Sequence, residues 1–112
     1  MTTEAFEDRV AKVGDVHKLV TELRTYTIEH EALGAARAKI DDMASALDCA
    51  ETCEVESDLE ANLTEARELA KDVESILTTA SRATPRGDLE TIDDIADARR
   101  SLGQIVDELL EV

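Results

Sequence analysis

The stretch Ser57–Asp88, SDLEANLTEARELAKDVESILTTASRATPRGD, decides the fold of this chain. Its apolar residues recur three and four positions apart, which is the spacing of one face of an α-helix. The pattern runs from Leu59 to Ala80 and stops before Ala83–Asp88, the segment that holds the only proline of the chain. The stretch therefore predicts a long amphipathic helix followed by a turn.

Residues that favour the start of a helix stand at both ends of this stretch. Ser57 and Glu60 have the spacing of a capping box, in which the two side chains satisfy free amides of the first helical turn. Asp88 is a good N-cap for a last helix, because its carboxylate can accept from the amides that follow. The apolar stripe of that last helix runs from Leu89 to Val112.

The N-terminal half carries two further stripes at helical spacing. The first covers about residues 3–31, and the second runs from Leu33 to Ala50. The two stripes differ in phase, so either the chain turns near residues 31–35, beside Gly34, or one long helix overwinds there. We favour the turn. Whether the first stripe forms one helix or two is also open, because Gly14 either separates a short leading helix from the main one or is tolerated inside a single helix.

These segments predict an all-α fold, an up-and-down helical bundle of three to four helices that forms a single domain over residues 1–112. Amphipathic helices must bury their apolar stripes against one another, and short connections place consecutive helices side by side. The core is closed either within one chain or by a second copy. We expect the core to include Leu19, Leu23, Leu47, Leu63, Val73, Leu77, Ile95, Leu102, Ile105 and Leu109.

The charge of the chain bears on its partners and its location. The 112 residues hold 27 Asp+Glu against 12 Lys+Arg, a formal net charge of -15. Nucleic acids and anionic membrane surfaces need clustered cations, whereas here only Arg99 and Arg100 are adjacent, so we expect neither as a direct partner. No apolar run is long enough to cross a bilayer, and the acidic N-terminus lacks the pattern of a secretion signal. A cytoplasmic protein is expected.

The acidic residues are poorly placed to support their own helices. The favourable order of an acid followed four residues later by a base occurs once, at Asp8 and Lys12. Seven pairs of acids stand four residues apart: Glu4/Asp8, Glu54/Asp58, Glu56/Glu60, Glu68/Asp72, Glu90/Asp94, Asp93/Asp97 and Asp107/Glu111. Salt screens such repulsion, and the composition resembles that of cytosolic proteins of extreme halophiles. We therefore predict adaptation to high salt.

Cys49 and Cys53 are the only cysteines and stand four residues apart. On one helical turn their Cβ atoms would be about 5–6 Å apart, too far for a relaxed disulfide. The two thiols could share a metal, but a structural zinc would need two more ligands, and His17 and His30 are distant in sequence. Two reduced cysteines without a metal are expected, with Cys49 and Cys53 kept as the candidates if one binds.

His30 stands at an apolar-stripe position and is followed by Glu31, Ala32, Leu33 and Gly34. This segment resembles the signature of histidine phosphotransfer domains, in which a phospho-accepting His on a four-helix bundle is followed by Lys and then Gly. Gly34 matches that pattern, whereas Leu33 stands where the family has its Lys. The resemblance implies His30 as a phosphoacceptor, against the alternative of a packed structural His.

These observations together predict a non-enzymatic bundle that acts through contacts with a protein partner or with itself, as a homo-oligomer. No catalytic motif, phosphate loop or dinucleotide fingerprint is present, and we expect no cofactor. One alternative function is a phosphotransfer module that uses His30. Another is an acidic mimic of nucleic acid that binds a basic protein.

Overall fold

The computed structural model describes residues 2–112, with side chains from Ala5 onward. Four α-helices follow one another: α1 (Thr2–Thr25), α2 (Gly34–Thr52), α3 (Glu56–Ala83) and α4 (Leu89–Glu111). A short 3-10 helix, η1 (Glu31–Leu33), precedes α2, and the described part of the chain contains no strand. The all-α prediction is confirmed.

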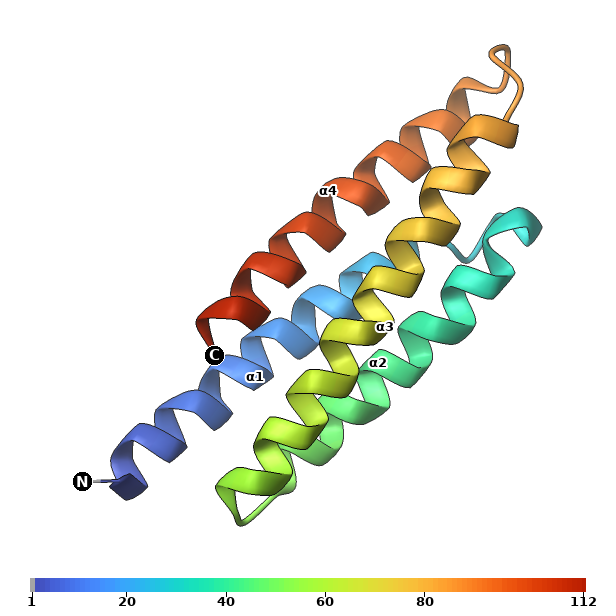
Figure 1. The fold of residues 1–112 in the computed structure, drawn as a ribbon. Helices are drawn as coiled ribbons and strands as arrows, with labels where there is room; N and C mark the ends of the chain where they lie inside the picture. The colour runs from blue at the N-terminus through green and yellow to red at the C-terminus, as the bar shows by residue number, and fades with distance from the viewer. Residues whose placement is uncertain (1) are drawn as a thin grey trace.

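The helices run alternately up and down, so that each neighbour in sequence is also a neighbour in space (Figure 1). Helix α1 packs against α2 and α4, and α3 packs against the same two helices from the opposite corner. The bundle measures 55 × 18 × 17 Å. The α1–α2 and α3–α4 connections lie at one end, which we call the upper end, and the α2–α3 connection lies with both chain ends at the lower end (Figure 1).

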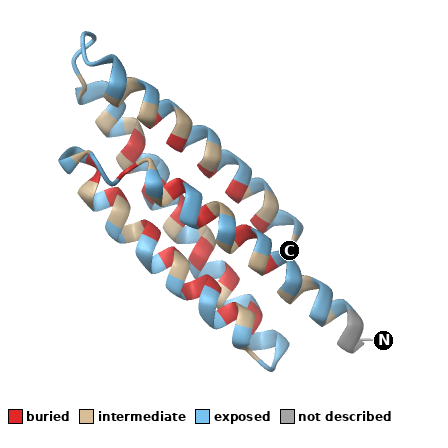
Figure 2. Ribbon diagram, turned by 180° about the vertical axis from the view of Figure 1, so that it is seen from behind, coloured by how far each residue is buried: buried red, intermediate tan, exposed pale blue. Residues whose placement is uncertain are grey.

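The core consists of one stripe from each helix, and the stripes face each other within the single chain (Figure 2). In α3, for example, Leu63, Ala66, Ala70 and Val73 are buried, and the spacing alternates between three and four residues. Nine of the ten predicted core residues are buried: Leu23, Leu47, Leu63, Val73, Leu77, Ile95, Leu102, Ile105 and Leu109.

The tenth predicted core residue, Leu19, is only partly buried, and its neighbour Val20 is fully buried instead. The stripe of α1 follows Val13, Val16, Val20 and Leu23, so the prediction is wrong at Leu19 and confirmed at Leu23. Helix α1 packs against both α2 and α4, and Val20 faces these two helices. Leu19, one residue earlier, lies at the margin of this contact and is only partly buried.

The structure also shows how the chain runs at Gly14 and before Gly34. Helix α1 continues through Gly14 without a break, and the chain does turn before Gly34, although α1 already ends at Thr25. Arg37 helps to hold this connection, because its Nη2 donates to the carbonyl oxygen of Thr27 at 2.8 Å and to that of His30 at 3.4 Å. Both carbonyl oxygens also accept from backbone N–H groups, that of Thr27 from His30 and that of His30 from Leu33, so Arg37 adds a second hydrogen bond to each.

The predicted capping box at Ser57 does not form. Helix α3 begins two residues earlier than predicted, with Val55 and not Ser57 as its N-cap, and Val55 makes no side-chain hydrogen bond. Glu60 turns instead to Arg9 of α1, which also binds Glu56 at 2.9 Å. The prediction for α4 is confirmed, because the Asp88 carboxylate accepts from the backbone N–H of Thr91.

Candidate functional site

A pocket of about 780 Å³ lies at the upper end of the bundle. Its walls are the α1–α2 connection, the last turns of α3 and the α3–α4 connection with the first turn of α4. Apolar side chains form much of the lining: Ala32, Ile76, Ala80, Ala83 and Pro85. Ligand pockets in proteins have this size and this mainly apolar character.

The polar groups of the pocket divide into hydroxyls and ionisable side chains. The hydroxyls belong to Ser75, Thr79, Thr84 and Thr91, and the ionisable side chains to Glu29, His30, Glu31 and Asp88. Two apolar side chains beside the lining in the sequence are exposed, Ile28 to 51% and Leu89 to 67%. We call the half-buried Ile76 and Ala80 the apolar floor of the pocket, and the exposed carboxylates of Glu29, Glu31 and Asp88 its negatively charged rim.

His30 is held in place at the edge of this pocket. Its Nε2 lies 2.6 Å from Oδ2 of Asp94 in α4, and its Nδ1 lies 3.5 Å from the hydroxyl of Thr91. The Thr91 hydroxyl in turn donates to Asp88 at 2.8 Å. His30 thus links the α1–α2 connection to the start of α4, and the hydroxyl and backbone N–H of Thr91 together lower the pKa of the Asp88 carboxyl.

The environment of His30 differs from what the phosphotransfer resemblance implies. His30 lies outside the helices, as the N-cap of η1, and its side chain is only 11% exposed. Both ring nitrogens face partners, and no lysine stands at the position of Leu33, which is buried. Nothing in this arrangement favours phosphoryl transfer, and that alternative stays an untested prediction.

The two cysteines lie at the end of α2 without a partner thiol. Cys49 is exposed, and Cys53 is the C-cap residue, where its Sγ donates to the carbonyl oxygen of Ala50 at 3.0 Å. Burial raises the pKa of the Cys53 thiol, and the charge of Asp58 raises it further. Neither cysteine belongs to a group of possible metal ligands among the residues that the structure describes.

The structure brings together a different set of ligands, which the sequence prediction missed. His17 in α1 meets Asp48 and Glu51 in α2, and one ligand atom of each lies within 4.8 Å of the others. The sequence predicts His17 only as a distant ligand for a zinc ion at the cysteines, because nothing in it fixes which residues of α1 and α2 face each other. A signal existed in Asp48 and Glu51, which share one face of a helix at a spacing of three.

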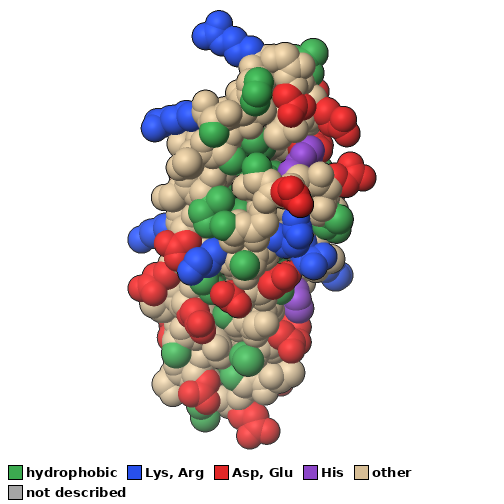
Figure 3. Space-filling model, turned by 90° about the vertical axis from the view of Figure 1, so that its right-hand side faces the viewer, with side chains coloured by type: hydrophobic (Ala, Val, Ile, Leu, Met, Phe, Trp, Pro, Cys, Tyr) green, Lys and Arg blue, Asp and Glu red, His purple; other side chains and the backbone are tan. Residues whose placement is uncertain are grey.

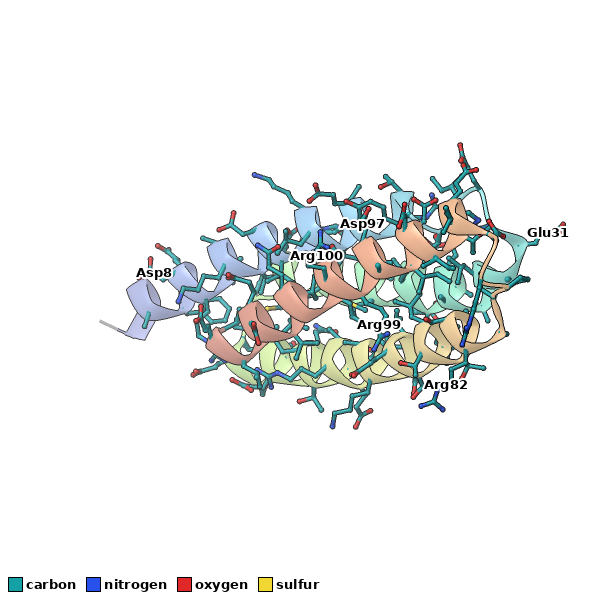
Figure 4. All side chains as sticks on the ribbon, turned by 90° about the horizontal axis from the view of Figure 1, so that it is seen from above. Asp8, Glu31, Arg82, Asp97, Arg99 and Arg100 are labelled. Atoms are coloured by element: carbon teal, nitrogen blue, oxygen red, sulfur yellow. The ribbon has the colours of Figure 1, made fainter. Side chains whose placement is uncertain are left out.

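The adjacent cations Arg99 and Arg100 form no basic patch. Figure 4 shows Arg100 beside Asp97 on α4, where the two form an ion pair at 3.3 Å. Arg99 lies on the side of α4 that faces α3, in a shallow hollow together with Glu74 and Asp107 (Figure 4). Acids therefore surround both arginines.

No helix in the described part of the chain is both long and apolar enough to cross a membrane. Comparison of the chain with protein-family models, with curated proteins and with solved structures finds no match.

Proposed function

We propose that this protein is a non-enzymatic binding module of the cytoplasm whose upper pocket receives a basic, amphipathic segment of a partner protein. The observation that carries the proposal is the pocket itself, with its apolar floor and the carboxylates of Glu29, Glu31 and Asp88 on its rim. A helix or loop that carries apolar residues on one side and Lys or Arg at its margins matches both features.

The charge distribution supports a basic partner. In Figure 3, Asp and Glu side chains gather near a histidine at one edge of the upper end, whereas Lys and Arg project from the opposite edge. A cationic segment that approaches a chain of net charge -15 is also attracted before contact. The apolar floor then adds the contact area that distinguishes this site from the rest of the acidic surface.

The proposal can be tested with a labelled helical peptide of Leu, Ala and Lys and with a matched peptide that has Glu in place of Lys. We expect the Lys peptide to bind the wild-type protein, and Ala83→Arg to weaken this binding at least tenfold, because the new side chain fills the pocket and adds a cation. Ala61→Arg is the matched control, since Ala61 is exposed on the same helix and lies outside the pocket. Fluorescence anisotropy measures both.

Three outcomes would overturn the proposal. Equal binding by the Ala83→Arg and Ala61→Arg proteins would indicate general attraction to the acidic surface. Competition by DNA for the Lys peptide without any effect of Ala83→Arg would favour the nucleic-acid mimic. A wild-type dimer that Ala83→Arg dissociates, seen by sedimentation, would show that a second copy fills the pocket and not a different protein.

We also propose that the acidic surface adapts the protein to a salt-rich cytoplasm. Several acids that the sequence places in repulsive pairs do find cations: Arg9 bridges Glu56 and Glu60, and Lys39 lies 3.7 Å from Asp72. The excess of acids over cations nevertheless remains large across the chain. Mobile cations of the solvent would then take the role that fixed cations have on other surfaces.

A further inference from the structure

The lower half of the bundle carries a cluster of metal-ligating side chains that lies apart from the upper pocket. Nδ1 of His17 and Oε2 of Glu51 are 3.4 Å apart, and the carboxylate of Asp48 lies one helical turn away from Glu51. The side chains of His17 and Glu51 are each 29% exposed, so an ion from solvent can reach them. The cluster is beside a hollow of about 400 Å³.

The separation of the first two ligand atoms fits one particular coordination geometry. Zinc binds His nitrogen and carboxylate oxygen at about 2.0–2.1 Å in a tetrahedral arrangement, in which neighbouring ligand atoms are roughly 3.3–3.4 Å apart. Nδ1 of His17 and Oε2 of Glu51 form a hydrogen-bond contact at 3.4 Å, and this separation is also compatible with one edge of that tetrahedron. One carboxylate oxygen of Asp48 lies within 4.8 Å of a ligand atom of each of the other two residues, and Asp48 is exposed on the surface of α2.

Gly14 makes room for this arrangement. The other carboxylate oxygen of Glu51, Oε1, lies only 3.2 Å from the position that a Cβ on residue 14 would occupy. A glycine inside a helix weakens it, yet α1 continues through Gly14. A side chain at position 14 would therefore crowd the Glu51 carboxylate.

We propose that His17, Asp48 and Glu51 form a binding site for a divalent transition metal of the zinc type. The ion would join α1 to α2 and keep its fourth position for water or for a ligand from outside the chain. One nitrogen and two carboxylate oxygens suit zinc and cobalt, whereas magnesium prefers oxygen ligands alone. This site is independent of the upper pocket and of the partner proposed for it.

The test is a calorimetric titration of the full chain with Zn²⁺, in a Cys49→Ser, Cys53→Ser background so that thiols do not contribute. Excess Mg²⁺ is present, because it occupies acidic surface positions that lack imidazole. We expect one zinc ion per chain and at least tenfold weaker binding after His17→Asn. His30→Asn is the matched control and should leave the affinity unchanged, since His30 lies at the other end of the bundle.

A second variant separates loss of the site from loss of the fold. Gly14→Ala improves the helix and displaces the Glu51 carboxylate by only a few tenths of an ångström, so we expect a more heat-stable apoprotein whose zinc affinity changes far less than that of His17→Asn. Cobalt should give a visible absorption band that His17→Asn removes. The proposal is overturned if zinc fails to bind, if several ions bind regardless of residue 17, or if Gly14→Ala weakens zinc binding as much as His17→Asn does.

Discussion

The imidazole of His30 and the carboxylate of Asp94 meet at 2.6 Å across 64 residues of sequence, and this contact fastens the α1–α2 connection to α4. The His30 side chain is 11% exposed and that of Asp94 31% exposed, so water screens the contact only in part. The pair closes one side of the upper pocket, whose lining includes His30 itself.

Separate replacement of His30 and Asp94 by Ala, together with the double variant, measures this contact. We expect a coupling energy of about 1 kcal/mol, because hydrogen bonds to charged groups contribute more than neutral ones but exposure reduces the gain. Urea unfolding followed by circular dichroism gives the three values. Additive losses would show that the two side chains stabilise the protein independently.

Leu102 tests the packing of α4. It is 3% exposed, so Leu102→Ala should lower the free energy of unfolding by roughly 2–5 kcal/mol. Leu110→Ala on the same helix is the control, since Leu110 is 70% exposed and its loss should change stability by less than about 0.5 kcal/mol. Similar losses for the two variants would contradict the register of α4.

The lower end of the bundle should respond to acid through Glu60. The hydrogen bond from Arg9 lowers the pKa of the Glu60 carboxyl below its usual value of 4.5, so its contribution to stability is present above that pH and is lost as the pH falls through the lowered pKa. The side chain of Glu60 is 49% exposed, which limits the contribution to about 0.5 kcal/mol.

Glu60→Gln removes this acid dependence. The difference in unfolding free energy between the wild type and Glu60→Gln should be constant near neutral pH and should shrink in acid. Thermal unfolding at a series of pH values measures it. A difference that grows as the pH falls would have the wrong sign for a carboxylate stabilised by Arg9.

Salt should stabilise the protein if its surface is adapted to it. The screening length falls from about 10 Å at 0.1 M salt to about 3 Å at 1 M, so repulsion between acids such as Asp93 and Asp97 weakens. We expect the midpoint of thermal unfolding to rise between 0.1 and 1 M KCl. The double variant Asp93→Asn, Glu111→Gln should show a smaller rise, and an unchanged midpoint in the wild type would refute the adaptation.

The sequence predicts most of the fold because each helix carries its own periodic stripe and because Asp88 and Pro85 mark one boundary locally. It fails where a residue depends on a distant partner. Ser57 and Glu60 have a good local capping pattern, but Arg9 offers Glu60 a stronger, charge-assisted contact. The choice of Val20 over Leu19 likewise depends on how α1 sits against two neighbours.

In the candidate sites, too, the sequence indicates single residues but not the distant partners that they contact. His30 is conspicuous in the sequence, but only the structure joins it to Asp94 and to the pocket. The set of His17, Asp48 and Glu51 spans two helices, and its assembly depends on the relative shift of α1 and α2 along their shared axis. A shift of one turn, about 5.4 Å, would separate these ligands, and local sequence patterns do not encode it.

Both chain ends lie at the lower end of the bundle, opposite the pocket, where the carbonyl of Val112 accepts from Nε of Arg9 at 2.8 Å. The two chain ends and the pocket proposed to bind a peptide therefore lie at opposite ends of the bundle. A label or surface linker attached at either end would leave the pocket pointing outward, at the far end of a rod 55 Å long. Immobilised protein should therefore bind a peptide as well as free protein does.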